Sequence, residues 1–311
     1  MTEAPTANLS DIKKLTLLAV ISLIALMPER ASRSACRSLA SARLQKTPQR
    51  LEGFESCLPE EIVGRIGGGA KILDQVLSLA YEEYRQVLRH YLPGGCRLEI
   101  RLVGQEHIQG ALREGRGAVL WISQFSSFHL ASKMAFHNAG YDTCHLSTIG
   151  HPFSFTRFGM KMLNPIVTGV EDRYLKCRVL LRAEGDSTES AGLRAIRELR
   201  RHLANNELVS FTVADTAQHL TEVPFFKARL ALPTAPINLA LAAGAPVLPV
   251  FTVEVAKGHY EVRIEPAREA NEGANRAAAI QQVAAAYAET LQTYVERFPL
   301  QWAGPFSFRG F

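Results

Sequence analysis

The sequence predicts an α/β fold with a mixed, largely parallel sheet that is flanked by helices. Apolar runs of strand length alternate with helical patterns from residue 97 onwards. One of these runs, Ala118–Ile122, is continuously apolar, as are strands buried on both faces of a parallel sheet. The 311 residues are 47% hydrophobic and 21% charged. This composition is typical of a folded protein, and the chain is long enough to bury a sizeable core.

The first 30 residues are predicted to form a tail and a membrane-associating helix, followed by one α/β domain over residues 31–311. A mostly apolar run at residues 15–27 comes directly after Lys13 and Lys14. As a helix it would cover about 20 Å at roughly 1.5 Å per residue, less than the ~30 Å hydrocarbon core of a bilayer. We therefore expect a helix that lies in the membrane surface without spanning it. A helix that packs on the main domain is the alternative.

The net charge of +5 comes from the N-terminal segment. Residues 1–50 hold eight Lys and Arg against three acidic residues, and the rest of the chain is neutral on balance. Basic side chains around an apolar helix favour anionic headgroups, here expected at the cytoplasmic face of the inner membrane. No nucleic-acid partner is expected, because the excess of basic residues does not extend beyond this segment.

The next segment, residues 31–95, is predicted to be helical. Its glycine-rich stretch at residues 64–71 is interpreted as a turn between helices, because no strand precedes it and Ile72 stands where a phosphate loop needs Ser or Thr. From residue 97 onwards, strands and helices are expected to alternate. We expect strands at residues 97–103, 118–122, 143–147, 208–213, 246–253 and 260–264, and helices at residues 106–114, 129–138, 191–205, 236–243 and 274–297.

The cysteines predict neither a disulfide framework nor a structural zinc site. Five of them are scattered along the chain without CxxC spacing, at positions 36, 57, 96, 144 and 177. An odd number of distant cysteines is typical of a protein in a reducing compartment. No group of Cys and His has the spacing of zinc ligands.

Several blocks occur in the order found in the lysophospholipid acyltransferase superfamily. The chain most resembles its lipid A biosynthesis lauroyl/myristoyl acyltransferase branch. The blocks are residues 104–117, Ala214-Asp215 with residues 223–227, residues 239–249, and Pro299-Leu-Gln-Trp302. The resemblance implies an acyl-chain groove and transfer of a fatty acyl group from an acyl carrier protein or coenzyme A thioester to a hydroxyl or amine. It implies no metal and no organic cofactor.

The chain departs from the resembled family at the catalytic signature. The family has a histidine base and, five positions later, an Asp or Glu that holds the imidazole. Here Gln124 and His129 occupy those positions. A neutral amide cannot act as the base, but Gln124 can donate a hydrogen bond to a thioester oxygen. His129 is the candidate base, because a helix N-terminus and Lys133 both favour a neutral imidazole.

Other residues near the signature have two interpretations each. Ser126 and Ser127 are candidate helix caps or substrate contacts, with a serine nucleophile as a further alternative. Asp215 follows an apolar strand and either orients His129 or caps a loop. His145 and His151 are interpreted as surface or strand-end residues, with an approach to the site as the alternative.

The remaining candidates concern the substrates. Lys227 stands after Phe225 and Phe226, where the resembled family has glycine, and this exchange predicts a changed acceptor pocket. Arg182 is a candidate contact for a phosphate or for an acidic group of the carrier protein. The arginines of residues 194–201 are expected to form a solvated helix face.

Two functions from different classes follow from these observations. The first is an acyltransferase with an altered catalytic centre, which moves an acyl group from a thioester to a lipid-like or specialised acceptor. The second is a non-catalytic protein that uses the same groove to bind a lipid or an acyl carrier protein. The two functions differ in whether another residue replaces the missing histidine base, because loss of a general base typically costs about 10²–10⁴-fold in rate.

Overall fold

The computed structural model describes residues 6–44, 58–181, 188–213, 219–268 and 273–304. Its centre is a seven-stranded sheet in the order β1-β9-β8-β2-β5-β3-β4, in which only the β8–β9 pair is antiparallel. The expected mixed, largely parallel sheet is therefore confirmed. The strands are β1 (Glu99–Val103), β2 (Ala118–Ile122), β3 (Thr143–Thr148), β4 (Cys177–Leu181), β5 (Leu208–Thr212), β8 (Val247–Ala256) and β9 (His259–Ile264).

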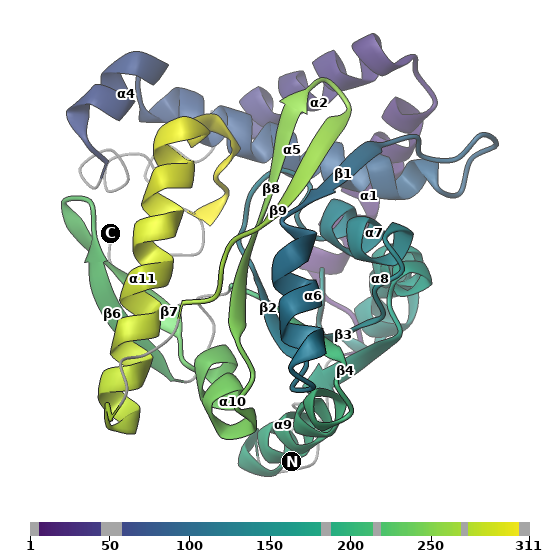
Figure 1. Ribbon diagram of the computed structural model, residues 1–311. Coiled ribbons are helices and arrows are strands. Elements are labelled where there is room, and N and C mark those ends of the chain that lie inside the picture. The colour runs from purple at the N-terminus through teal and green to yellow at the C-terminus, as the bar shows by residue number, and fades with distance from the viewer. Residues whose placement is uncertain (1–5, 45–57, 182–187, 214–218, 269–272, 305–311) are drawn as a thin grey trace.

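Helices cover both faces of the sheet, and the alternation of side chains along β2 explains why (Figure 1). Leu120 faces a core that holds Phe136 of α7 (Leu130–Asn138), beside α6 (Gln105–Arg113). Trp121 faces the other side and stacks on Tyr287 of α11 (Arg276–Arg297), with ring centres 4.2 Å apart. The helices α9 (Thr188–Ala204) and α10 (Ala235–Ala243) lie on the α11 side. Both faces of β2 are thus buried, as its apolar sequence predicts.

Several elements were not expected from the sequence. A two-stranded hairpin, β6 (Leu220–Phe225) and β7 (Ala228–Pro233), packs against α11. The edge strand β4 follows β3 after a segment that holds the π-helix η2 (Gly159–Leu163), α8 (Asn164–Glu171) and the short helix η3 (Asp172–Tyr174). A short edge strand and a π-helical turn have no strong periodic pattern, because neither buries a regular stripe of side chains.

The long helix α5 (Gly69–Arg89) links the N-terminal helices to the sheet. It follows α4 (Glu60–Ile66), and the turn between them has Gly67 and Gly68 at φ +86° and +105°. The expected turn between helices is therefore confirmed. Near its C-terminal end, Gln86 donates a hydrogen bond to the hydroxyl of Tyr260 on β9 at 2.8 Å. This end of α5 lies beside the start of α7, where the candidate site is built.

The N-terminal helices α1 (Leu9–Ala25) and α2 (Glu29–Leu44) pack on α5. Leu18, Ile21 and Ile24 of α1 are buried against the domain, whereas Leu23 and Leu26 are 68% and 67% exposed. The alternative of packing on the main domain is therefore realised, and one side of the same helix is left apolar and exposed. No helix among the described residues is long and apolar enough to cross a membrane.

Cys144 and Cys177 form a disulfide, and the expectation of no disulfide is wrong for this pair. The two residues lie 33 positions apart in the sequence. They become register partners because β3 and β4 pair in parallel, with Cys144 opposite Cys177. Only the strand pairing brings them together, so the spacing of the cysteines along the chain could not reveal it.

Candidate functional site

The segment between β2 and α7 turns sharply at Ser127, whose φ is +50°. The Ser127 hydroxyl donates a hydrogen bond to the side-chain oxygen of Gln86 on α5 at 2.6 Å. Ser126 is 1% exposed, and its hydroxyl has no hydrogen-bond partner among the described residues. The turn is therefore held from outside by α5, and it directs the chain into the first turn of α7.

A carboxylate from α5 caps the start of α7. One oxygen of Glu83 accepts the backbone N–H groups of His129 and Leu130 at 2.9 and 3.0 Å. The expectation that Ser126 or Ser127 caps this helix is wrong, since neither side chain accepts a bond from its first turn. Burial raises the pKa of Glu83 to about 7, although both backbone bonds oppose the shift.

The His129 imidazole lies at this helix start without a hydrogen bond to any side chain or backbone group in the described part of the chain, and its Nδ1 is buried. Its ring contacts those of Phe128 and His151, with centres 3.9 and 4.9 Å away. Burial, together with the charges of His151 and Lys133, holds the pKa of His129 well below its usual range. The ring is therefore neutral near pH 7, which is the state that a general base requires.

Glu171, at the end of α8, is the carboxylate that accompanies this histidine. It is fully buried. One of its oxygens lies 3.3 Å from Nε2 of His151, and the other lies 3.2 Å from Nζ of Lys133 and 2.8 Å from a nitrogen of Arg178. Burial alone would raise the pKa of Glu171, but Lys133 and His151 hold it well below its usual range. Glu171 is therefore ionised, and its carboxylate contacts three basic side chains.

His151 belongs to this cluster and is not the surface residue that the sequence suggested, because its side chain is 17% exposed and contacts Glu171. The loop after it is held from two directions. Asp11 of α1 accepts hydrogen bonds from the hydroxyls of Ser154 and Thr156 at 2.6 and 2.7 Å. Asn164 of α8 accepts the backbone N–H of Ser154 at 3.1 Å. The N-terminal helix is therefore part of the support of the site.

Burial also lowers the pKa of two further basic groups in this region. Lys133 is 1% exposed, donates to the backbone oxygen of His129 at 2.8 Å, and has its pKa lowered by burial, with Glu171 opposing the shift. His145 lies in the interior of β3, where Nδ1 meets the hydroxyl of Ser210 at 2.8 Å. Burial holds the pKa of His145 well below its usual range. The interpretation of His145 as a surface or strand-end residue is wrong, because it is buried in the middle of β3.

The remaining candidates from the sequence that the structure describes are Gln124, Phe225, Phe226 and Lys227. Gln124 donates to the backbone oxygen of Val213 at 2.5 Å, so its amide is fastened to the end of β5. Phe225 packs with Trp302 in the core on the α11 side of the sheet, and Phe226 contacts Phe225. Lys227 forms an exposed ion pair with Glu60 at 2.9 Å. The aromatic pair and Lys227 are thus separated by the sheet from the His129 cluster.

Two predicted site residues, Asp215 and Arg182, lie outside the described residues. The basic face of α9 is solvated as expected, since its four arginines are exposed; they are Arg194, Arg197, Arg200 and Arg201. Sequence reasoning missed Glu83, Glu171 and Arg178. One signal existed for Glu83, because it continues the buried stripe Val76–Leu79–Glu83–Val87 of α5, where an acidic residue is unusual.

The ligand atoms of His129, His151 and Glu171 lie within 4.8 Å of one another, and such groups can hold a metal ion. The electrostatics of the cluster favour a different use. Lys133 and Arg178 already contact the carboxylate that a divalent cation would need. A cation here would meet two positive charges at close range, and the residues therefore fit proton transfer better than metal binding.

An apolar cavity of about 420 Å³ opens between α1, the end of α5 and α8. Its lining comes from α1, α5, the segment after α5, η2 and α8, and consists of Ser22, Ala25, Leu88, Tyr91, Leu92, Met162, Pro165 and Ile166. Ile166 and Glu171 lie on the same helix, α8, about 8 Å apart along its axis at roughly 1.5 Å per residue. A five-residue offset turns the two side chains to different sides of α8, so the helix lies between the cavity and the buried carboxylate.

Comparison with known families identifies the family of the chain. A search among curated proteins found no match. The family model for bacterial lipid A biosynthesis acyltransferases matches residues 95–303, which contain the sheet, the strand–turn–helix of β2 and α7, and all of the His129 cluster except Glu83. This match covers about two thirds of the chain. The protein belongs to the bacterial lipid A biosynthesis acyltransferase family.

Proposed function

We propose that this protein is an acyltransferase whose catalytic base is His129. The donor is an acyl thioester of an acyl carrier protein or coenzyme A, and the acceptor is a hydroxyl or amine of a lipid-like or specialised molecule. The observation that carries the proposal is the buried, neutral imidazole of His129, which lies beside the contact between His151 and the ionised carboxylate of Glu171. This arrangement supplies a proton acceptor and an ionised carboxylate, the two functions that the resembled dyad combines.

The reaction in this proposal is an acyl transfer through a tetrahedral intermediate. The acceptor oxygen or nitrogen attacks the thioester carbonyl carbon while His129 takes the acceptor proton. The intermediate collapses, the carbon–sulfur bond breaks, and the leaving thiolate receives a proton from the His129 imidazolium. Glu171 acts as a positioning residue, because its charge stabilises the imidazolium that forms nearby. Gln124 is proposed to hold the end of β2 against the end of β5, because its amide donates a hydrogen bond to the backbone oxygen of Val213.

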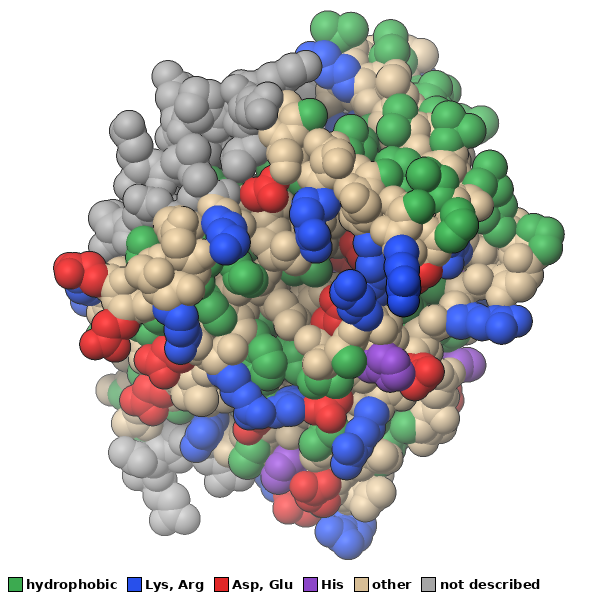
Figure 2. All heavy atoms as spheres, turned by 90° about the horizontal axis from the view of Figure 1, so that it is seen from above, with side chains coloured by type: hydrophobic (Ala, Val, Ile, Leu, Met, Phe, Trp, Pro, Cys, Tyr) green, Lys and Arg blue, Asp and Glu red, His purple; other side chains and the backbone are tan. Residues whose placement is uncertain are grey.

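The apolar cavity and α1 suit a lipid substrate. The cavity is lined mainly by apolar side chains and continues onto α1, whose outer side is apolar and exposed. Figure 2 shows hydrophobic side chains gathered along one margin of the molecule, next to a band of Lys and Arg side chains. An apolar surface bordered by basic groups is typical of proteins that lie on anionic membranes. We propose peripheral association with the cytoplasmic face of the inner membrane.

The test is transfer by the purified full-length protein from carrier-protein and coenzyme A thioesters to a panel of lipid hydroxyls and amines. His129→Ala should lower the transfer rate by about 10²–10⁴-fold, the usual range for loss of a general base. His137→Ala is the matched control, because His137 is exposed on the same helix. Unchanged transfer by His129→Ala contradicts the assignment. If His151→Ala alone abolishes transfer, the base is His151.

The second candidate is a non-catalytic binding protein, and Gln124 is the observation that favours it. The resembled family has its histidine base at this position, and here the amide is bound to Val213. This reading predicts tight binding of a lipid or an acyl carrier protein without transfer from any donor. It also predicts that His129→Ala leaves that binding unchanged.

A further inference from the structure

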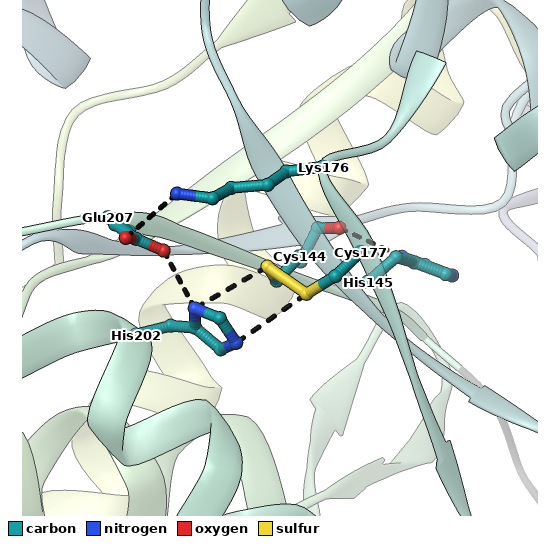
Figure 3. The surroundings of a disulfide bond; sticks show 7 residues. Cys144, His145, Lys176, Cys177, His202 and Glu207 are labelled. Atoms are coloured by element: carbon teal, nitrogen blue, oxygen red, sulfur yellow. Dashed lines mark hydrogen bonds and ion pairs between the residues drawn. A yellow bond between two sulfur atoms is a disulfide. The ribbon is translucent and has the colours of Figure 1, made fainter. Parts of the chain in front are cut away.

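A second cluster of reactive groups lies on the edge of the sheet, outside the candidate site (Figure 3). The disulfide of Cys144 and Cys177 lies beside the imidazole of His202 on α9, whose Nε2 is 3.5 Å from the Cys177 sulfur. The other ring nitrogen, Nδ1, is 2.7 Å from a carboxylate oxygen of Glu207. Nδ1 also lies 3.6 Å from the Cys144 sulfur, so the imidazole contacts the carboxylate and both sulfurs of the disulfide.

The protonation of His202 follows from its neighbours. The hydrogen bond from Lys176, at 2.9 Å, and the one from His202 hold the pKa of Glu207 below its usual value, so Glu207 is ionised near pH 7. An ionised carboxylate only accepts hydrogen bonds, and Nδ1 of His202 must therefore carry a proton. In the neutral ring Nε2 then has a free lone pair, and this lone pair faces Cys177.

The two sulfurs differ in their access to solvent. Cys144 is fully buried on β3, whereas Cys177 lies partly exposed on the edge strand β4. Lys176 and His202 border Cys177, and their side chains are 41% and 19% exposed. A reagent from solution therefore reaches Cys177 first, and Cys144 is placed to react with Cys177 from inside.

We propose that Cys144 and Cys177 form a reversible thiol–disulfide site whose redox partner is a dithiol, with Cys177 as the reactive thiol and the Glu207–His202 pair as its base. During reduction, a thiolate of the dithiol attacks the Cys177 sulfur, the protein S–S bond breaks, and Cys144 leaves as a thiolate that takes up a proton. The second thiol of the partner then attacks the mixed disulfide and releases Cys177. Two electrons pass to the protein, and the partner becomes a disulfide.

In the reduced protein the Cys177 thiol gives its proton to Nε2 of His202. The resulting thiolate is stabilised by the imidazolium, which Glu207 stabilises in turn. Oxidation reverses the sequence: the Cys177 thiolate attacks an external disulfide, and Cys144 resolves the mixed disulfide. This site is separate from the proposed acyl transfer, although Arg178, which binds Glu171, is the residue directly after Cys177.

The experiment measures alkylation of the reduced full-length protein by iodoacetamide at pH 7, in the presence of a chelator. Peptides are identified by mass spectrometry after cleavage at glutamate, which leaves Cys177 as the only cysteine between Glu171 and Glu184. We expect His202→Asn to slow alkylation of Cys177 by about 10-fold or more, since the thiolate loses its cation. Glu207→Gln should slow it less, and the exposed controls His137→Asn and Glu198→Gln should leave it unchanged.

A parallel titration in mixtures of reduced and oxidised glutathione should interconvert the dithiol and the disulfide reversibly, and Cys144→Ser should abolish the transition. The proposal is overturned if the Cys177 rate does not respond to His202→Asn, or if no disulfide of Cys144 and Cys177 forms in any mixture. It is also overturned if the reduced protein, without chelator, binds one equivalent of zinc that Cys144→Ser removes. That result would assign the same groups to a metal site.

Discussion

Nε2 of His151 lies 3.3 Å from Oε1 of Glu171, and this pair joins a loop and a helix that are 20 residues apart in the sequence. It places an imidazole–carboxylate contact beside His129, which has Met134 and not an acidic residue five positions later in the sequence. The region around His129 therefore holds both an imidazole and a carboxylate, although they come from different elements.

Replacement of Glu171 by Gln should strongly destabilise the protein. The change removes the negative charge that contacts Lys133, His151 and Arg178, and it leaves the buried ammonium group of Lys133 without its ion-pair partner. Breaking a buried ion pair in this way typically costs about 3–5 kcal/mol. Urea denaturation of the two proteins measures the difference. Asp172→Asn is the matched control, because Asp172 also pairs with Arg178 but is 50% exposed, and it should cost less than about 1 kcal/mol.

The acidic limb of the transfer reaction should lie below pH 6.5. Burial and the neighbouring His151 and Lys133 lower the pKa of His129, so the base stays neutral and active at a pH where an ordinary histidine is largely protonated. The measurement is the rate of transfer between pH 5 and 8 under conditions where the protein remains folded. An acidic limb above pH 7 would contradict the role of a buried, neutral His129.

Glu83 should make the protein less stable as the pH rises. Burial raises the pKa of Glu83 to about 7 in the folded protein. A raised pKa gives stability that is fully present below the unfolded value of about 4.5 and is lost as the pH rises through 7. Glu83→Gln keeps an oxygen for the two backbone bonds and removes the titration. Its free energy of unfolding relative to the wild type should therefore increase between pH 5 and pH 8, and an unchanged difference would oppose this assignment.

Loss of the Asp11 carboxylate should impair the site from a distance. Asp11→Ala removes the acceptor of the Ser154 and Thr156 hydroxyls and loosens the loop that follows His151. Each unsatisfied buried hydroxyl costs about 1–3 kcal/mol. We expect faster proteolysis within residues 151–158 and a lower kcat. Thr16→Ala on the same helix, whose exposed hydroxyl bonds only to the backbone oxygen of Ile12, should change neither measurement.

The exposed apolar side of α1 should carry most of the membrane affinity. Leu23 and Leu26 are more than two thirds exposed, so Ser at both positions should leave thermal unfolding unchanged. Burial of a leucine side chain gives about 1.5–3 kcal/mol, and the double variant should bind anionic vesicles at least about 10-fold more weakly. Flotation with such vesicles measures this. Leu193→Ser, at an exposed leucine of α9, is the control. If this variant and the α1 double variant lose vesicle binding equally, the result argues against α1 as the docking surface.

Local patterns in the sequence were sufficient for most of the fold. The apolar strand Ala118–Ile122 was predicted at its observed bounds, and α7 differs from its prediction by one residue. The hairpin β6–β7 and the edge strand β4 were missed, because their burial patterns mix buried and exposed positions without a clear period. The family was also identified from the sequence, and the family model confirms it with a match over residues 95–303.

The candidate site was predicted only in part. His129 was proposed as a candidate because it lies in the turn after a recognisable strand, where helix position and Lys133 already indicated a neutral ring. Its carboxylate partners, Glu83 and Glu171, come from α5 and α8, and no spacing along the chain relates them to α7. The same holds for Cys144 and Cys177, which meet only through the parallel register of β3 and β4.

The sequence by itself therefore determined the elements, their alternation and the family, because hydrophobic periodicity and short motifs are local properties of the chain. The tertiary structure alone decided which charges share the site and which cysteines meet. Those contacts depend on how distant elements pack, and burial then sets whether an imidazole is neutral or a carboxylate is charged.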